Sequence, residues 1–267
     1  MTSKIVVLAA GRGTRMQAAA SAELSAEQQA AADSGHKAMI PIGRPFLDYA
    51  LAAYADAGLT DVCLIIGPNH HNVREYYERL DTQRITISFA VQQQPIGVAN
   101  AVLAAKDFVG DDSFIVVNGD NYYPSSVIAQ LRETAAPALP AYSRQGLLRA
   151  GQIEAARIAA YALLDITPDG TLRRIVEKPS PAQVVAMGDA RVSLNSWLFT
   201  PQILEACERV PQSARGEYEL PDAVQLGIDL LGMTFRTFPA EESVLDLSNR
   251  NDISSVAQRL RGVTVTL

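Results

Sequence analysis

The segment "VVLAAGRGTRMQ", residues 6–17, joins an apolar run to a loop that holds two glycines and two arginines. The apolar start predicts a buried strand. Gly11 and Gly13 allow the backbone after this strand to approach a ligand closely. Arg12 and Arg15 add positive charge, which suits the turn to binding an anion. An ordinary turn after a strand shows the same pattern, so the remaining sequence has to distinguish an anion-binding loop from a turn without a ligand.

Strand-like and helix-like runs alternate after this segment, which is typical of parallel βαβ units. Strands are predicted at residues 4–10, 61–67, 85–91 and 113–120, and helices at 46–58, 71–80 and 97–110. In such Rossmann-like, doubly wound sheets, ligands bind beyond the carboxyl ends of the strands. We therefore expect the site to be formed by the loops at residues 9–15, 67–71, 92–97 and 118–122.

The second half of the chain is less regular. The turn residues of "TPDG" predict an antiparallel pair of strands at residues 160–166 and 172–177, beside the main sheet. Further strands are expected at 191–199, 234–239 and 242–247, and helices at 201–210, 220–232 and from about residue 252. The length of 267 residues suits one large domain. We predict a single α/β domain over residues 1–267 with a mixed sheet and a small β appendage.

A long connection lies between Arg15 and Lys37. It has 21 residues, where connections in compact domains usually have about four to six. Ser25 and Gln28 fit a capping box and Gly35 fits a helix stop, so a short helix is predicted here. Two interpretations stay open for the alanine-rich segment at residues 18–33, a mobile lid over the mouth of the site and an excursion without a role.

Composition excludes several functions. The formal charge of −6 argues against a general nucleic-acid binder, because phosphate contacts need a basic surface. The sequence holds no run of about 18 apolar residues that would span a bilayer. Cys63 and Cys207 are predicted to be buried thiols of a reducing compartment, and the first apolar run lacks a signal-peptide cleavage pattern. A cytoplasmic location is expected, without a membrane or nucleic-acid partner.

Known nucleotide motifs are incomplete in the first loop. "GxxxxGK[ST]" is absent, which disfavours a P-loop ATPase. Met16 stands where the dinucleotide fingerprint has its third glycine, which disfavours a nicotinamide-dependent dehydrogenase. His70 and His71 are interpreted as exposed and incidental, and no spacing of ligands predicts a zinc site.

Six segments in order resemble those of the sugar-1-phosphate nucleotidylyltransferases, or NDP-sugar pyrophosphorylases, which include glucose-1-phosphate thymidylyl- and uridylyltransferases. They are "LAAGRGTRM" with the lysine of "HKAMIPIGRPFLDY", "FAVQQQPIGVANA", "VVNGDNYY", "VEKPS", "RGEYELPDAV" and "SVLDLSNRNDI". The likeness runs from about residue 4 to residue 253. It implies a magnesium-dependent enzyme that condenses a nucleoside triphosphate with a sugar 1-phosphate and releases pyrophosphate.

The resemblance also implies the roles of individual residues. Arg15 and Lys37 would grip the triphosphate, and Lys178 would neutralise the attacking sugar phosphate. Asp120 and Asp246 would hold Mg²⁺, with Asp120 counted among the catalytic residues. Nucleotide binding would fall to Leu8, Ala9, Ala10, Gly11, Gly13, Thr14, Gln92 and Gly97. Sugar binding would fall to Glu177, Lys178, Asn195, Tyr161 and Ala162.

Some positions depart from the family pattern or raise a geometric difficulty. Neighbours on a strand point to opposite faces, so Glu177 and Lys178 reach one pocket only if the chain bends at Pro179, and we predict this bend. Ala162 stands where many glucose-using members have glycine, so the sugar either sits differently or is not glucose. Asp246 is followed by "LSN", where members of the family often have Thr-Gly. The sequence does not rank UTP, dTTP, GTP, ATP and CTP.

Two alternatives share the fold, a catalytically silent ligand-sensing homologue and a cytidylyltransferase that acts on an alcohol phosphate. The charged residues that the resemblance assigns to phosphate and metal binding are all present, which favours an active enzyme over a silent homologue. The segment "VEKPS" favours a sugar 1-phosphate over an alcohol phosphate as substrate. The charged residues meant are Arg15, Lys37, Asp120, Lys178 and Asp246. We expect a nucleotide-binding part at about residues 1–123, a sugar-binding part at 124–240, and the second metal aspartate with a helix at 241–267. Homo-oligomers are common in the family, so self-association is possible.

Overall fold

The computed structural model describes residues 1–18, 22–135 and 137–267, and all statements on structure refer to these. Its strands are β1 (Lys4–Leu8), β2 (Asp61–Ile66), β3 (Thr86–Val91), β4 (Phe114–Asn118), β5 (Asn121–Tyr122), β6 (Ala138–Tyr142), β7 (Ala162–Ile166), β8 (Leu172–Val176), β9 (Val192–Ser193), β10 (Trp197–Phe199), β11 (Arg236–Ala240) and β12 (Leu245–Asp246). Its first helices are α1 (Thr14–Gln17), α2 (Ala26–Ser34), the 3₁₀ helix η1 (Lys37–Met39), α3 (Phe46–Asp56), α4 (His71–Arg79), α5 (Val98–Leu103) and α6 (Lys106–Val109). The others are α7 (Ser125–Glu133), α8 (Arg144–Ala150), α9 (Ala155–Ala159), α10 (Pro181–Ala186), α11 (Ile203–Arg209), α12 (Leu220–Leu231) and α13 (Asp252–Arg259).

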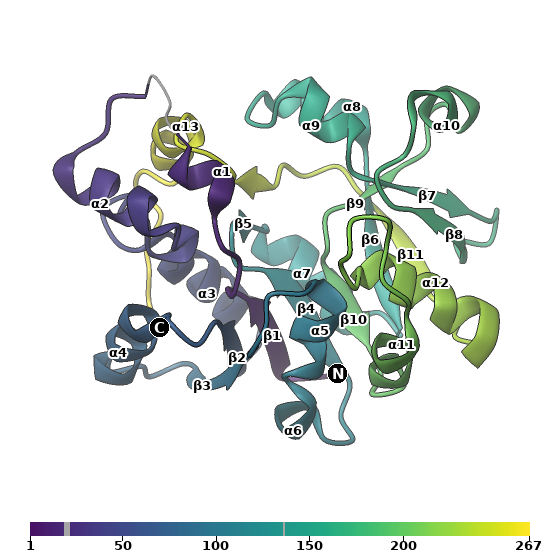
Figure 1. Ribbon diagram of the computed structural model, residues 1–267, viewed down its shortest axis with the longest axis horizontal. Coiled ribbons are helices and arrows are strands. Elements are labelled where there is room, and N and C mark those ends of the chain that lie inside the picture. The colour runs from purple at the N-terminus through teal and green to yellow at the C-terminus, as the bar shows by residue number, and fades with distance from the viewer. Residues whose placement is uncertain (19–21, 136) are drawn as a thin grey trace.

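One mixed sheet crosses the molecule in the order β3-β2-β1-β4-β10-β6-β9-β7-β8, with β11 also paired to β6 (Figure 1). Strands β3, β2, β1 and β4 are parallel, and β10 is antiparallel to β4. The predicted α/β class with a doubly wound mixed sheet is therefore confirmed. The antiparallel pair β7 and β8 lies at one end of this same sheet, where the appendage was predicted.

The alternation of side chains along β1 explains why helices cover both faces of the sheet. Ile5 and Val7 pack in a cluster with α3 residues, whereas Val6 packs in a second cluster with α5 residues. All three are fully buried, and each such side chain stabilises the fold by about 1.5 to 3 kcal/mol. Because β1 lies between β2 and β4 with helices on both sides, its carboxyl end, where the next loop begins, is fixed in the middle of the parallel part of the sheet.

Several elements were not predicted, namely β5, β6, α1, η1 and the helices α7 to α10. Pro140 argues against a central strand because it cannot donate to the ladder. In the structure, β10 and β9 pair with β6 only at Ala138 and Tyr142, which leaves the middle of this edge of β6, at Pro140, without ladder pairs. The helix predicted at residues 97–110 is divided into α5 and α6.

The helix predicted in the long connection is confirmed as α2. Ser25 and Gln28 form its capping box, and Gly35 ends it in the left-handed conformation with φ 75°. Arg250 ties α2 to the C-terminal region through Asp33, at 2.5 Å. No residue of α2 lines the cavity described below, and the lid interpretation stays a prediction; residues 19–21 of that segment lie outside the described part of the chain. No described helix has the length and apolar character needed to cross a bilayer.

Candidate active site

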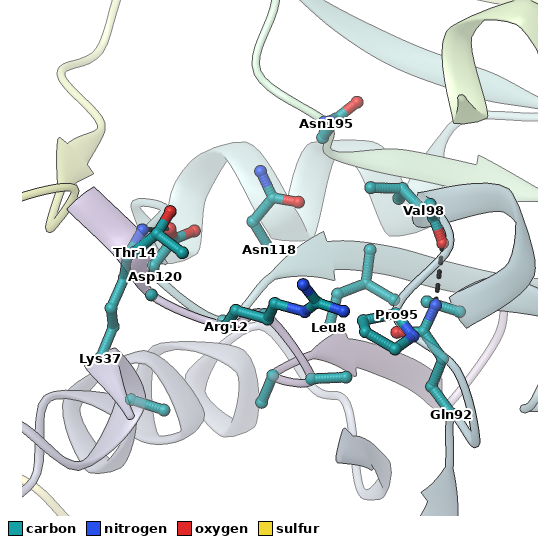
Figure 2. A pocket seen from close by; sticks show the side chains of 18 of the residues that line it. Leu8, Arg12, Thr14, Lys37, Gln92, Pro95, Val98, Asn118, Asp120 and Asn195 are labelled. Atoms are coloured by element: carbon teal, nitrogen blue, oxygen red, sulfur yellow. Dashed lines mark hydrogen bonds and ion pairs between the residues drawn. The ribbon is translucent and has the colours of Figure 1, made fainter. Parts of the chain in front are cut away.

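A cavity of about 560 Å³ opens at the carboxyl ends of β1 and β4, at the predicted edge of the sheet. It is lined by the predicted residues Leu8, Ala9, Ala10, Gly11, Gly13, Thr14, Lys37, Gln92, Gly97, Asp120 and Asn195. Figure 2 shows Lys37, Thr14 and Asp120 at one end of this cavity and Gln92 with Pro95 at the other. Segments far apart in the sequence therefore meet around one space.

The loop after β1 is shaped by a close backbone contact. Gly13 has φ 61°, and a Cβ at this position would lie 2.0 Å from the Gly35 carbonyl oxygen. Only glycine tolerates both conditions. The loop turns directly into α1 and exposes Arg12, whose side chain extends over the cavity toward Pro95 (Figure 2). Arg15 lies exposed on α1 and is not among the residues that line the cavity, so its role stays a prediction.

An ion pair stands at the end of the cavity where Thr14 lies. Lys37 on η1 places its Nζ 2.7 Å from Oδ2 of Asp120, which follows β4. The Lys37 side chain is 14% exposed and the Asp120 side chain 28% exposed. Both groups thus keep access to the cavity while balancing each other's charge.

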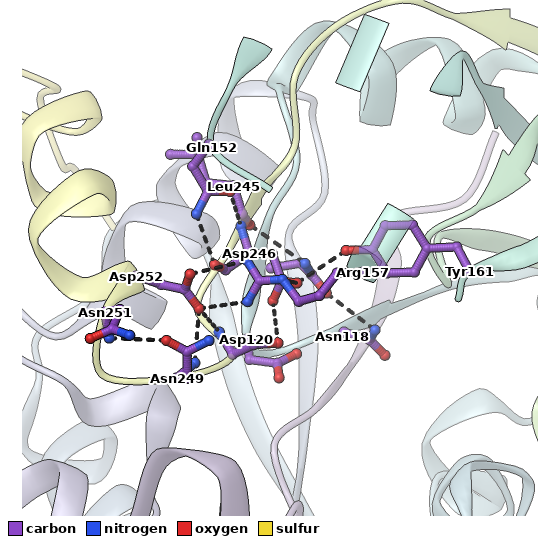
Figure 3. Close-up of polar contacts among 12 residues, drawn as sticks. Asn118, Asp120, Gln152, Arg157, Tyr161, Leu245, Asp246, Asn249, Asn251 and Asp252 are labelled. Atoms are coloured by element: carbon purple, nitrogen blue, oxygen red, sulfur yellow. Dashed lines mark hydrogen bonds and ion pairs between the residues drawn. The ribbon is translucent and has the colours of Figure 1, made fainter. Parts of the chain in front are cut away.

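The second predicted metal residue, Asp246, lies on the strand next to Asp120. β12 pairs with β5 so that Asp246 is opposite Asn121, and the Leu247 N–H donates to the Asp120 carbonyl at 2.9 Å. Asp246 is buried, and its carboxylate accepts hydrogen bonds from Ser248 Oγ at 2.8 Å and the Tyr161 hydroxyl at 3.1 Å (Figure 3). Burial and the neighbouring charge of Asp120 raise the pKa of Asp246.

The chemistry of these two side chains fits Mg²⁺. This ion takes hard oxygen ligands and is usually held by one or two carboxylates together with substrate phosphates and water. The carboxylates of Asp120, in the turn before β5, and of Asp246, on β12, repel each other, and a cation between them relieves that repulsion. Among residues 1–18, 22–135 and 137–267, no group of three or more His, Cys, Asp or Glu side chains is placed to hold a metal ion alone.

Two of the predicted sugar residues have unusual backbones. Lys178 and Asn195 have φ of 44° and 55°, and they are the non-glycine residues with positive φ in the described chain. Such conformations are costly and cluster at functional sites. The backbone thus leaves the extended conformation at Lys178, one residue before Pro179, and the predicted meeting of Glu177 and Lys178 in one pocket stays a prediction. Asn195 stands between β9 and β10 and lines the cavity, whereas Lys178 does not.

Tyr161 and Ala162 are placed differently from each other. Ala162 begins β7 and is buried beside Ser193 of β9. The Tyr161 hydroxyl donates to Asp246, so this side chain is engaged with the acidic group. Neither residue lines the cavity, and their predicted contacts with a sugar stay predictions.

Glu177 ends in a cluster of charged groups. Burial, together with the negative charges of Glu219 and Asp222, raises the pKa of Glu177 to about 7, although the nearby Arg215 acts to lower it. Nη2 of Arg215 lies 3.9 Å from Oε1 of Glu177 and also contacts Glu219. The carboxyl group of Glu177 thus titrates near neutrality, where it changes between donor and acceptor.

This raised pKa predicts a pH-dependent loss of stability. The folded protein binds the Glu177 proton more tightly than the unfolded chain, whose pKa is near the ordinary value of 4.5. The stabilisation is therefore complete below about pH 4.5 and disappears as the pH rises through about 7. Glu177→Gln removes this component, so the thermal midpoint of the wild type should fall relative to the variant between pH 5 and pH 8. Parallel curves for the two proteins would contradict the assignment.

The far end of the cavity is a slot around Gln92. Its Nε2 donates to the Gly97 carbonyl at 2.9 Å and to Asn100 Oδ1 at 3.1 Å, which engages both amide hydrogens. Gly97 has φ 128° and is pressed against Tyr218, whose N–H donates to Ile96 at 2.8 Å. These hydrogen bonds fix the Gln92 amide and the backbone of residues 96–99 against the segment at Tyr218.

Eight lining residues were not among the predicted site residues, namely Arg12, Ala38, Pro95, Val98, Ala101, Asn118, Gly119 and Glu217. Asn118 was within a loop expected at the site, because it ends a buried strand. The interpretation of His70 as exposed is wrong: the residue is 9% exposed, and the centroid of its ring lies 4.2 Å from that of the His36 ring. Burial lowers the pKa of His70 to about 4, so this side chain is neutral.

Comparison with known proteins places the chain in a family. Residues 4–235 match the family model described as nucleotidyl transferase. Glucose-1-phosphate thymidylyltransferase of Streptomyces antibioticus is 31% identical over 235 residues, which cover 85% of this chain and 57% of that protein. The low-salt glycan biosynthesis nucleotidyltransferase Agl11 of Haloferax volcanii is 29% identical over 201 residues, or 72% of this chain and 51% of that protein. The chain thus spans about half the length of these curated relatives.

A solved structure named UDP-glucose pyrophosphorylase complexed with UDP-glucose shares the fold. Its TM-score is 0.74 at 18% identity, with 98% of this chain and 99% of that chain covered. The resemblance seen in the sequence is confirmed by the family match, which extends over most of the chain. The chain belongs to the nucleotidyl transferase family.

Proposed function

We propose that this protein condenses a nucleoside triphosphate with a sugar 1-phosphate to give an NDP-sugar and pyrophosphate. The observation that carries the proposal is the cavity at the carboxyl ends of β1 and β4, which gathers the glycine loop, Lys37, Asp120 and the Gln92 slot. The relatives named above as thymidylyltransferase and pyrophosphorylase support the same class of substrate.

In the proposed reaction, a phosphate oxygen of the sugar 1-phosphate attacks the α-phosphorus of the nucleotide. A new P–O bond forms, and the bond to the β-phosphate oxygen breaks, with its electron pair leaving on pyrophosphate. No covalent intermediate with the protein is required, so catalysis rests on positioning and charge stabilisation. A bound Mg²⁺, held by Asp120 and Asp246, would supply further stabilisation of the phosphate charge.

The residues divide this work by position. The glycine loop brings backbone N–H groups close to the polyphosphate. Lys37 faces the same end of the cavity and stabilises negative charge that develops on the leaving pyrophosphate. The Gln92 slot holds the base at the far end. Asn195, on its strained backbone between β9 and β10, is a hydrogen-bonding partner for hydroxyl groups of a substrate.

A matrix of pyrophosphate release tests this function. Purified protein is assayed with UTP, dTTP, GTP, ATP and CTP, each against several hexose 1-phosphates and against alcohol phosphates, with Mg²⁺ present. The expected result is release that requires both one nucleotide and one sugar 1-phosphate. Release with an alcohol phosphate alone would instead identify a cytidylyltransferase of that class, and no release from any pair would contradict an active enzyme.

Lys178→Ala tests the assignment of the sugar phosphate. A charge-assisted contact is worth about 1.5 to 3 kcal/mol, so the KM for the sugar 1-phosphate should rise at least tenfold. The KM for the nucleotide should change less than about twofold. Lys106→Ala is the matched control, because Lys106 forms an exposed ion pair with Glu208 away from the cavity. An unchanged KM for the sugar phosphate in Lys178→Ala would exclude the assigned role.

A further inference from the structure

Arg157 connects α9 to the acidic loop, residues 246–252, that carries the second carboxylate. Its Nη1 and Nη2 donate to the two carboxylate oxygens of Asp252 at 2.7 and 3.0 Å. Its Nε lies 3.8 Å from Oδ2 of Asp246 (Figure 3). One guanidinium group thus faces two buried carboxylates, and it reaches them from a segment of sequence that showed no motif.

The Nε of Arg157 is not satisfied by a hydrogen bond. It is buried and has no partner within hydrogen-bond distance in the described chain. The Asp246 oxygen that it faces accepts instead from the Tyr161 hydroxyl. The side chains of Arg157 and Asp246 are 14% and 7% exposed, so little water screens their charges from each other. Arg157 therefore balances part of the charge of Asp246 without a direct bond to it.

The backbone of Asp246 is held so that it cannot move away from this cation. The Asp246 N–H donates to Oε1 of Gln152 at 2.9 Å, and Nε2 of Gln152 donates to the Asp246 carbonyl at 3.0 Å. Gln152 thus occupies the place of a neighbouring strand beside β12. Gln152 and Arg157 both come from the segment of α8 and α9, so this one segment fixes where the Asp246 carboxylate lies and which charge it meets.

We propose that Arg157 is a resident counter-ion that competes with a divalent cation for Asp246 and thereby sets how tightly the site holds that cation. The proposal rests on the role of Asp120 and Asp246 in the function proposed above. Any cation that approaches these two carboxylates shares Asp246 with a guanidinium group that is already present. Arg157 is a positioning residue in this scheme, because it acts through Asp246.

Direct titration with Mn²⁺, followed by the electron paramagnetic resonance signal of the free ion, tests the proposal without turnover. Arg157→Met should bind Mn²⁺ about tenfold more tightly, the effect of removing one unit charge at close range. Asp252→Asn should bind it at least threefold more weakly, because the released guanidinium turns toward Asp246. Arg144→Met is the control on the same segment, since Arg144 donates to the Gly188 carbonyl; its affinity should stay within twofold of the wild type.

Opposite shifts in the Mn²⁺ affinity of Arg157→Met and Asp252→Asn distinguish competition from a purely structural role of the Arg157–Asp252 ion pair. Both substitutions break that ion pair, so a structural role predicts weaker binding in both. Weaker binding in both variants, or no change in either, would overturn the proposal. If Arg157→Met does not fold, Arg157→Lys keeps the charge and should bind Mn²⁺ within threefold of the wild type; tenfold tighter binding in that variant would overturn the proposal as well.

The same titration separates this proposal from the proposed function. Wild-type protein that binds no Mn²⁺, with Asp120→Asn no different, would remove the metal site and the inference together. If the wild type binds Mn²⁺ and releases pyrophosphate, but Arg157→Met and Asp252→Asn do not shift the Mn²⁺ affinity in opposite directions, only the inference about Arg157 is refuted.

Discussion

Asp120→Asn is expected to lower the rate of pyrophosphate release by about 10³ at saturating substrates. The substitution keeps the size of the side chain but removes the charge that faces the cavity beside Lys37. Loss of charge stabilisation in the transition state is worth several kcal/mol, and each 1.36 kcal/mol is a factor of ten in rate. The measurement is a coupled assay of pyrophosphate at fixed Mg²⁺, with the pair of substrates that the matrix identifies.

The control for this substitution is Asp169→Asn. Asp169 lies in the exposed turn between β7 and β8 and bonds only to Thr167 and Thr171 in the described chain. Asp169→Asn makes the same chemical change as Asp120→Asn, but outside the cavity. The rate of pyrophosphate release by this variant should therefore equal that of the wild type. Turnover above a tenth of the wild-type rate in Asp120→Asn would mean that this carboxylate is not part of the machinery.

Gly97→Ala is expected to destabilise the fold by about 2 to 6 kcal/mol, since backbone strain and overpacking each cost about 1 to 3 kcal/mol. The new Cβ would lie 2.4 Å from both the backbone N and O of Tyr218, and φ is 128°. Backbone atoms cannot rotate away as a side chain does. The same shift moves the partner of the Gln92 amide, so nucleotide affinity should fall together with stability. Urea unfolding and nucleotide titration measure the two effects.

Gly110→Ala separates steric contact from backbone strain. Gly110 also has a positive φ, 56°, but a Cβ there would meet no atom within 4 Å. Its cost should therefore be limited to the conformational strain of about 1 to 3 kcal/mol, with unchanged nucleotide affinity. Equal losses of stability in the two variants would show that the contact between Gly97 and Tyr218 contributes nothing.

The parallel half of the fold was predictable because its strands are buried on both faces. Such strands appear in a sequence as continuous apolar runs, and β1, β2 and β4 do. β6 was missed because Pro140 contradicts a strand by local rules, and the exception depends on β9 and β10 leaving that position free. Helices α8 and α9 were missed because their short, alanine-rich segment has no clear period.

The candidate site was predictable where it depends on the edge of the sheet. Asp120 and Gln92 each follow a strand of known direction, so their neighbourhood follows from topology. The surroundings of Asp246 do not follow in this way. They depend on Tyr161 and Arg157, which approach from residues 143–161, and the packing of a segment without periodic pattern is decided by tertiary contacts alone.

The attachment of Tyr218 has a consequence for how such an enzyme diversifies. Its N–H and C=O bond to Ile96 and Ala99 through main-chain atoms, so the wall beside the cavity stays in place whatever side chain follows Gly216. Glu217 lines the cavity from this wall. Substitutions at position 217, in evolution or in a saturation library, can thus change which ligand is preferred while the backbone held by Tyr218 keeps its position.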